Sequence, residues 1–237
     1  MNTALLFLLI VAIVSYFILK KKKGVLLTFE TKVNDDLFRH YSEMVKEATA
    51  LHKAGKYDDA VEILKAAYRE AEEKKLTLTV KDYLKLPPYL QKAKRNDEAW
   101  AWFNTLIRQT ASDHMSLSEI YDKMRLFRQR ERDPKDAIKY GVLSRVHWCL
   151  GLHEQVTKMG WDDRKDELKN CKARLGEGYV ELLKKADCEH LEDELKKIIS
   201  THMSSFPSIR LPDLVRDING LVSNAVAGVV YTARSDK

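Results

Sequence analysis

The sequence has few of the residues that build β-rich or disulfide-rich proteins. It contains 9 glycines and 5 prolines in 237 residues, which leaves little room for long loops or for the many turns of a β fold. Its 3 cysteines are an odd number without paired spacing. No disulfide framework is predicted, and free thiols suit a reducing compartment. These absences favour a helical chain.

The motifs of common catalytic and metal sites are also absent. No CxxC, HxxxH or Gly-x-Ser-x-Gly pattern occurs, and the run Leu175–Tyr179 lacks the lysine of a phosphate-binding loop. His147, Cys149 and His153 are close in sequence but too few for a zinc site. The sequence therefore predicts no enzyme, no cofactor and no metal. A hydrolase in the C-terminal half is the remote alternative.

The positive charge is concentrated at one place. Of the net charge of +6, four charges belong to Lys20–Lys23, which leaves +2 for the rest of the chain. The basic run Arg125–Arg132 contains Glu131 and falls on a predicted helix end. Since no aromatic or glycine pattern accompanies that run, nucleic acid is not an expected partner.

The longest apolar run is Thr3–Leu19, which has no charged residue over 17 positions. As a helix it spans about 26 Å, close to the ~30 Å hydrocarbon core of a bilayer. A cleaved signal peptide is the alternative, but no basic residue precedes the run. The lysines after it predict a single-pass membrane anchor with the C-terminal domain in the cytoplasm. A bacterial inner membrane is favoured, although receptors of the mitochondrial outer membrane share this layout. The residues expected at the membrane interface are Tyr16, Lys20, Lys21, Lys22 and Lys23.

One stretch recurs beyond the lysines. Leu51–Leu64 reads LHKAGKYDDAVEIL and Leu90–Phe103 reads LQKAKRNDEAWAWF, with matching residues at a constant offset of 39. Each copy has the pattern of a helix end, a tight turn and a helix start. Repetition of such a unit at this period is typical of an α-solenoid.

The first copy resembles the tetratricopeptide repeat, a family of helix pairs with small residues where the two helices cross. The matching residues, all within 41–74, are Ala48, Gly55, Tyr57, Ala60, Leu64 and Ala67. The second copy departs from the pattern at Lys94 and Asn96, and Pro87 and Pro88 interrupt its first helix. There we expect helices near Val80–Leu86, Pro88–Lys94 and Asp97–Thr110.

A third helix pair is predicted farther along the chain. Ser116 and Glu119 have the spacing of a capping box. Asp133, followed directly by proline, is typical of a helix start. Ala137 takes the small-residue position, and Gly151 is expected to end this helix.

The predicted architecture is therefore all-α, in four parts. Residues 1–23 form the membrane anchor, 24–33 a connector, 34–160 a short irregular solenoid of tetratricopeptide-like repeats, and 161–237 a C-terminal helical extension. The last helix, beginning at Pro212, has a wide apolar face. It either caps the open end of the solenoid or contacts lipid or a partner.

The resemblance implies a membrane-anchored scaffold or adaptor that binds a protein partner, whose identity stays open. Such proteins bind segments of their partners along the first helices of the repeats. By position, the candidate contacts are Thr49, His52, Lys53, Lys92 and Arg128. The alternative is a membrane-active effector, such as an exclusion or immunity factor, that uses both the anchor and the last helix on lipid.

Overall fold

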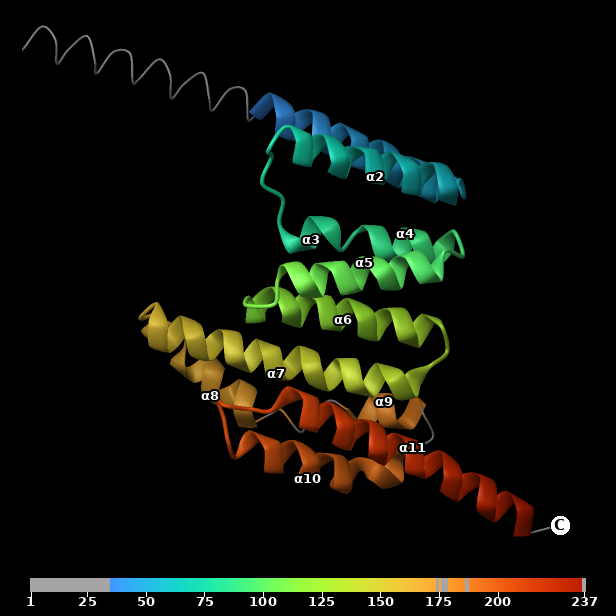
Figure 1. Ribbon diagram of the computed structural model, residues 1–237, viewed down its shortest axis with the longest axis vertical. Helices are drawn as coiled ribbons and strands as arrows, with labels where there is room; N and C mark the ends of the chain where they lie inside the picture. The colour runs from blue at the N-terminus through green and yellow to red at the C-terminus, as the bar shows by residue number, and fades with distance from the viewer. Residues whose placement is uncertain (1–34, 174, 176–178, 186–187, 236–237) are drawn as a thin grey trace, which may run out of the picture. The chain divides into compact units, whose positions relative to one another are not determined.

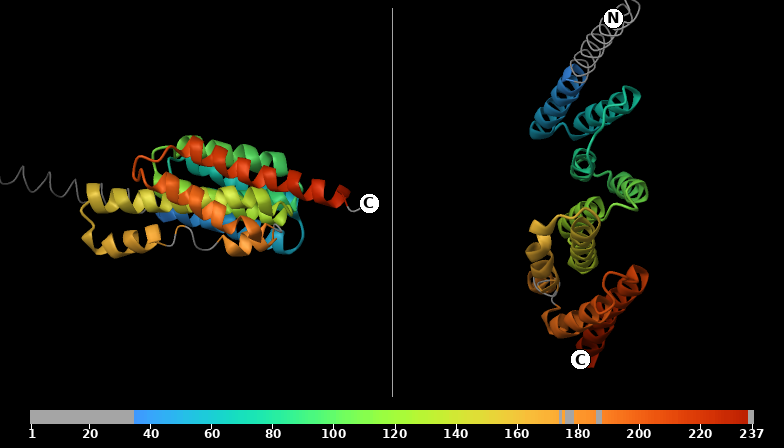
Figure 2. Two further views of the ribbon diagram at one scale, coloured as in Figure 1. Left: turned by 90° about the horizontal axis from the view of Figure 1, so that it is seen from below. Right: turned by 90° about the vertical axis from the view of Figure 1, so that its left-hand side faces the viewer.

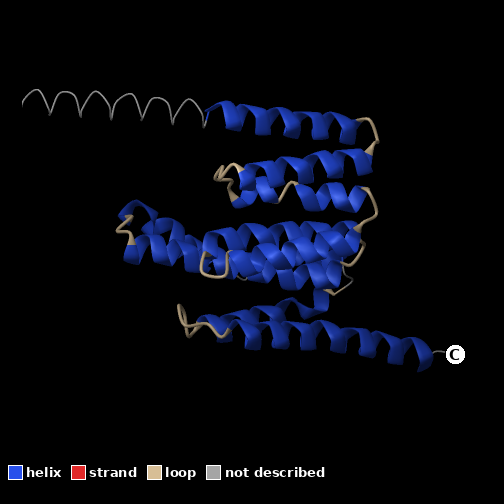
Figure 3. Cartoon of the chain, turned by 45° about the horizontal axis from the view of Figure 1, so that its top comes forward, coloured by secondary structure: helices blue, strands red, loops and turns tan. Residues whose placement is uncertain are grey.

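The computed structural model describes residues 35–173, 175, 179–185 and 188–235. Within these ranges all regular structure is helical, as Figure 3 shows, which confirms the all-α prediction. The predicted membrane segment, its interface residues and the connector lie outside the described ranges. Among the helices that are described, none is both long and apolar enough to cross a membrane.

The chain divides into two compact units, with the boundary between Thr79 and Val80. The first unit contains a helix at residues 35–53 and α2 (Tyr57–Glu73). The ring of Tyr68 stacks on that of Tyr41, with centroids 6.4 Å apart, and joins the two helices. The whole apolar stripe of α2 is buried, namely Ala60, Val61, Leu64, Ala67, Tyr68 and Ala71.

Three helix–turn–helix junctions share one backbone geometry. Gly55, Lys94 and Arg132 have φ angles of 78°, 61° and 62°. At each junction the N–H of this residue donates to the carbonyl three positions earlier, and the next N–H donates to a carbonyl five positions earlier. The junctions are 39 and 38 residues apart, and Lys75, with a φ of 56° at the end of α2, makes the same pair of hydrogen bonds outside this spacing. Lysine and arginine here adopt the left-handed conformation that glycine adopts without strain.

The second unit begins with three short helices, α3 (Val80–Tyr83), α4 (Leu86–Lys92) and α5 (Asn96–Gln109). Pro87 and Pro88 lie in the first turn of α4, where a missing N–H loses no helical hydrogen bond. The prolines therefore start a helix, and the break comes before Leu86, slightly earlier than the sequence predicts. Trp102 of α5 donates its Nε1–H to the carbonyl of Tyr83 at 3.0 Å, which holds α5 against α3.

A long hairpin forms the centre of the second unit, made of α6 (His114–Arg130) and α7 (Pro134–Lys158) (Figure 1). Asp113 is the N-cap of α6, because its side chain accepts hydrogen bonds from two N–H groups of the first turn. The prediction that Ser116 caps this helix is therefore wrong by three positions. Asp133 caps α7, as its sequence predicts.

Gly151 lies inside α7 and does not end it, contrary to the prediction. The helix continues to Lys158, and the left-handed residue that follows is Gly160, with a φ of 70°. A Cβ atom at Gly151 would lie 2.5 Å from Sδ of Met115 on α6. Glycine at this position therefore allows close packing of the two helices.

The rest of the second unit folds along α7. It contains a 3-10 turn (Asp162–Arg164), α8 (Lys165–Ala173), α9 (Val180–Lys185), a second 3-10 turn (Glu189–Leu191), α10 (Glu192–Met203) and α11 (Leu211–Ser235). Helices α8 and α9 pack against α7, and α10 lies beside α11 (Figures 1 and 2). Leu214, Ile218 and Leu221 bury the first half of α11 in the core that it shares with α7 and α10.

A disulfide joins Cys149 of α7 to Cys171 of α8, and Cys188 is a buried thiol outside this disulfide. The prediction of free thiols is therefore wrong for two of the three cysteines. The paired residues are 22 positions apart in sequence, yet their Cα atoms are 6.0 Å apart, because the chain reverses after α7. Spacing in the sequence gives no sign of that reversal.

Candidate functional site

An open groove of about 880 Å³ lies along α7 in the second unit. Its walls come from α3, α6, α8 and α9, together with one face of α7. On α7 the lining residues are Gly141, Ser144, Arg145 and Trp148, at positions i, i+3, i+4 and i+7 of one helix face. This helical spacing is visible in the sequence, although the residues that face it from other helices are not.

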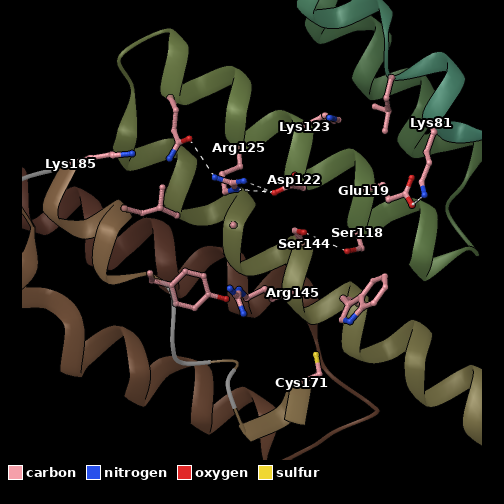
Figure 4. Close-up of a pocket in the computed structure, with 16 residues that line it drawn as sticks. Lys81, Ser118, Glu119, Asp122, Lys123, Arg125, Ser144, Arg145, Cys171 and Lys185 are labelled. Atoms are coloured by element: carbon pink, nitrogen blue, oxygen red, sulfur yellow. Dashed lines mark hydrogen bonds and ion pairs between the residues drawn. The ribbon is translucent and has the colours of Figure 1, made fainter. Parts of the chain in front are cut away.

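The groove has more basic than acidic side chains. Five cations line it, Lys81, Lys123, Arg125, Arg145 and Lys185, against the two carboxylates of Glu119 and Asp122. Figure 4 shows Lys185 at one end and the Lys81–Glu119 pair at the other, with Arg125 and Arg145 between them.

Both carboxylates of the groove are already compensated. Lys81 lies 3.4 Å from Glu119, and Arg125 lies 2.6 Å from Asp122. The other three cations, Lys123, Arg145 and Lys185, have no carboxylate partner among the described residues. The excess positive charge of the groove therefore belongs to these three side chains.

Two polar atoms at the groove are left without a hydrogen bond. The hydroxyl of Tyr179 and Oε2 of Glu119 are both buried, and neither has a partner among the residues that the structure describes. Tyr179 is only 2% exposed, although it lines the groove. A buried polar group without a partner costs about 1–3 kcal/mol, and a ligand that supplies partners would recover that free energy.

The hydroxyl of Tyr179 is in its neutral form. Burial raises its pKa well above the ordinary tyrosine value, and the positive charge of Arg145 offsets this only in part. The Cζ atom of Arg145 lies 5.9 Å from the centroid of the Tyr179 ring. A neutral hydroxyl can donate a hydrogen bond, and it stands beside a guanidinium that has donors only.

Several contacts join the walls of the groove to α7. Ser118 of α6 and Ser144 of α7 place their hydroxyl oxygens 3.4 Å apart. A Cβ at Gly141 would lie 3.2 Å from Cδ of Arg125, so glycine lets the arginine cross the face of α7. Cys171, at the rim, is fixed to α7 through the disulfide.

The contact residues predicted from the sequence do not gather at this groove. Thr49, His52 and Lys53 belong to the first unit, near the end of its first helix. Lys92 and Arg128 belong to the second unit, at the ends of α4 and α6. These two ends are neighbours, because the side-chain amide of Gln91 donates to the carbonyl of Phe127 at 3.0 Å.

Arg128 is already engaged within its own hairpin. Its guanidinium lies 2.9 Å from carboxylate oxygens of both Glu131 and Asp136. The same group stacks over the ring of Trp100, with Cζ 4.1 Å from the centroid. These contacts give Arg128 a role in joining α5, α6 and α7, whereas Lys92 is exposed.

A second buried polar cluster lies between α6 and α7. Nδ1 of His114 and Nδ1 of His147 are 2.9 Å apart, and the Tyr121 ring stacks on His147 at 5.3 Å. Burial, and then the charge of His114, lower the pKa of His147 to about 4. Within the described ranges no group of three or more His, Cys, Asp or Glu could hold a metal ion. This low pKa keeps His147 neutral near pH 7.

In its described residues the chain has an all-α fold that presents an open groove with more basic than acidic side chains. Comparisons with protein-family models, with curated proteins and with solved structures find no match for this chain.

Proposed function

We propose that this protein is a membrane-tethered adaptor that binds a segment of a partner protein in the groove along α7. The observation that carries the proposal is the groove itself, with its three uncompensated cations and its two unpartnered buried atoms. The proposed membrane tether is inferred from the apolar run Thr3–Leu19 and the lysines that follow it. The tetratricopeptide resemblance, which remains part of the proposal, is supported by the spacing of 39 and 38 residues between the three helix–turn–helix junctions.

A protein segment suits the groove because a peptide brings both hydrogen-bond donors and acceptors. The hydroxyl of Tyr179 can donate, whereas Oε2 of Glu119 can only accept. Both atoms are within the lining of the same groove. A peptide backbone alternates N–H and C=O groups, and so can satisfy both kinds of atom along its length.

The alternative of a membrane-active effector receives less support. It requires the apolar face of the last helix to contact lipid. Leu214, Ile218 and Leu221 of α11 are instead packed in the core of the second unit. That packing is what a capping helix makes, and it occupies the first half of the apolar face.

Site-specific photo-crosslinking tests the proposal. A photoreactive amino acid is placed at Lys123, at the rim of the groove, in the full-length chain in native membranes. The matched control carries the same amino acid at Lys197, an exposed lysine of α10 outside the groove. We expect a discrete protein adduct from position 123 and none from position 197. Equal labelling from both positions, or none from 123, contradicts a groove-bound partner.

A further inference from the structure

We propose that Arg145 and Tyr179 form a carboxylate-binding subsite, which selects partner segments that carry a glutamate or aspartate side chain. The inference rests on the proposed function, because it names the chemistry of the segment that the groove binds. It assigns a joint role to Arg145 of α7 and to Tyr179, which directly precedes α9.

The geometry brings two different donors to one place in the groove. The exposed guanidinium of Arg145 has no carboxylate partner among the described residues, and its Cζ lies 5.9 Å from the Tyr179 ring centroid. The hydroxyl of Tyr179 is buried and unpartnered. An arginine fork and a neutral hydroxyl together match the two oxygens of a carboxylate, which accept several hydrogen bonds at once.

Tyr179 is fixed in place before any ligand arrives. Its carbonyl accepts a hydrogen bond from the N–H of Leu183 at 2.8 Å, in the first turn of α9. Its ring also packs in the core of the unit. A donor held rigidly in this way loses little side-chain entropy on binding.

The remaining groove charges favour an acidic peptide over nucleic acid. Lys123 and Lys185 flank the subsite and attract negative charge. Glu119 and Asp122 also line the groove, and a phosphate chain, with one charge on each nucleotide, would have to lie against them. An acidic peptide supplies carboxylates to Arg145 and N–H donors to Glu119.

Fluorescence anisotropy with defined probes tests the subsite on the full-length chain in detergent. The first probe is a labelled synthetic peptide of about ten residues, long enough to cross the groove when extended, with glutamate at alternate positions. The second replaces each glutamate by glutamine, and the third is an oligothymidylate. We expect binding of the glutamate peptide, and at least about tenfold weaker binding of the other two.

Two variants assign the binding to the subsite. Tyr179→Phe keeps the ring and removes only the hydroxyl, and we expect about tenfold weaker binding of the glutamate peptide. Arg145→Gln should weaken binding at least as much. The matched control Lys123→Gln removes one rim charge and should weaken binding less, with a smaller salt dependence. Circular dichroism checks that each variant keeps its helical content.

The outcomes separate this inference from the proposed function. In one outcome, crosslinks form from position 123 while Tyr179→Phe and Arg145→Gln bind the glutamate peptide as the parent chain does. That result overturns the proposed subsite and leaves the proposed adaptor function intact. The proposal of an acidic partner is overturned if the glutamine peptide or the oligothymidylate binds as tightly as the glutamate peptide, or more tightly. It is also overturned if the glutamate peptide does not bind. Absence of both peptide binding and specific crosslinks overturns the adaptor as well.

Discussion

Replacing Tyr179 by phenylalanine should stabilise the unliganded protein. The hydroxyl is buried, 2% of the residue is exposed, and no described residue hydrogen-bonds to it. Its removal ends a desolvation penalty of about 1–3 kcal/mol and leaves the ring packing unchanged. Because the hydroxyl borders an open groove, we expect the lower half of that range. For a chain of this length the change in melting temperature is about 2–4 °C per kcal/mol.

Tyr140→Phe is the matched control, because it removes a tyrosine hydroxyl from the same unit. The Tyr140 hydroxyl, unlike that of Tyr179, is not among the buried atoms left without a hydrogen bond, so its loss should not stabilise the chain. Urea and thermal unfolding, followed by circular dichroism without any ligand, measure both changes. A Tyr179→Phe chain that is less stable than the parent would refute the claim that this hydroxyl awaits an external partner.

Three further predictions concern the core of the second unit. The folded chain keeps His147 neutral to pH about 4 whereas the unfolded chain protonates it near pH 6.5. As the pH falls from about 6.5 to about 4, the free energy of unfolding should therefore decrease by up to about 3 kcal/mol. In urea titrations, His147→Gln should make the free energy of unfolding less dependent on pH over this range. An alkylating reagent should label one cysteine of the denatured, unreduced chain and three after reduction. Replacing Cys149 and Cys171 by serine should cost about 3 kcal/mol. Gly151→Ala, which would clash with α6, should destabilise by about 1 kcal/mol, whereas Gly220→Ala, with no atom within 4 Å of the new Cβ, should stabilise by up to about 1 kcal/mol in denaturant unfolding.

Local signals in the sequence were enough to predict most helices. Helix ends follow from left-handed residues and N-caps, which act within one turn, and Gly55 and Asp133 have the roles that their neighbours indicate. The predictions failed where two local signals competed. Asp113 and Ser116 can both cap a helix, and the chain uses the earlier one. Gly151 has the sequence signal of a helix end, but it marks a close contact with α6 instead.

The candidate site could not be predicted from local signals in the sequence. Arg145 and Tyr179 are on separate segments, and no periodicity relates residues across the reversal of the chain between α7 and α8. The face of α7 that includes Ser144 and Arg145 was visible as a helical spacing. The residues that face α7 across the groove could not be identified, because the groove walls depend on where α8 and α9 pack.

The sequence by itself determined the helical class and helix boundaries such as those at Gly55 and Asp133, because these depend on backbone preferences within a few residues. It also carries the apolar run Thr3–Leu19 on which the membrane proposal rests. Only the tertiary structure decided that Cys149 meets Cys171, and that three cations and a buried tyrosine share one groove. The physical reason is that packing against α7 sets those distances, and packing depends on the shape and volume of side chains from remote parts of the chain.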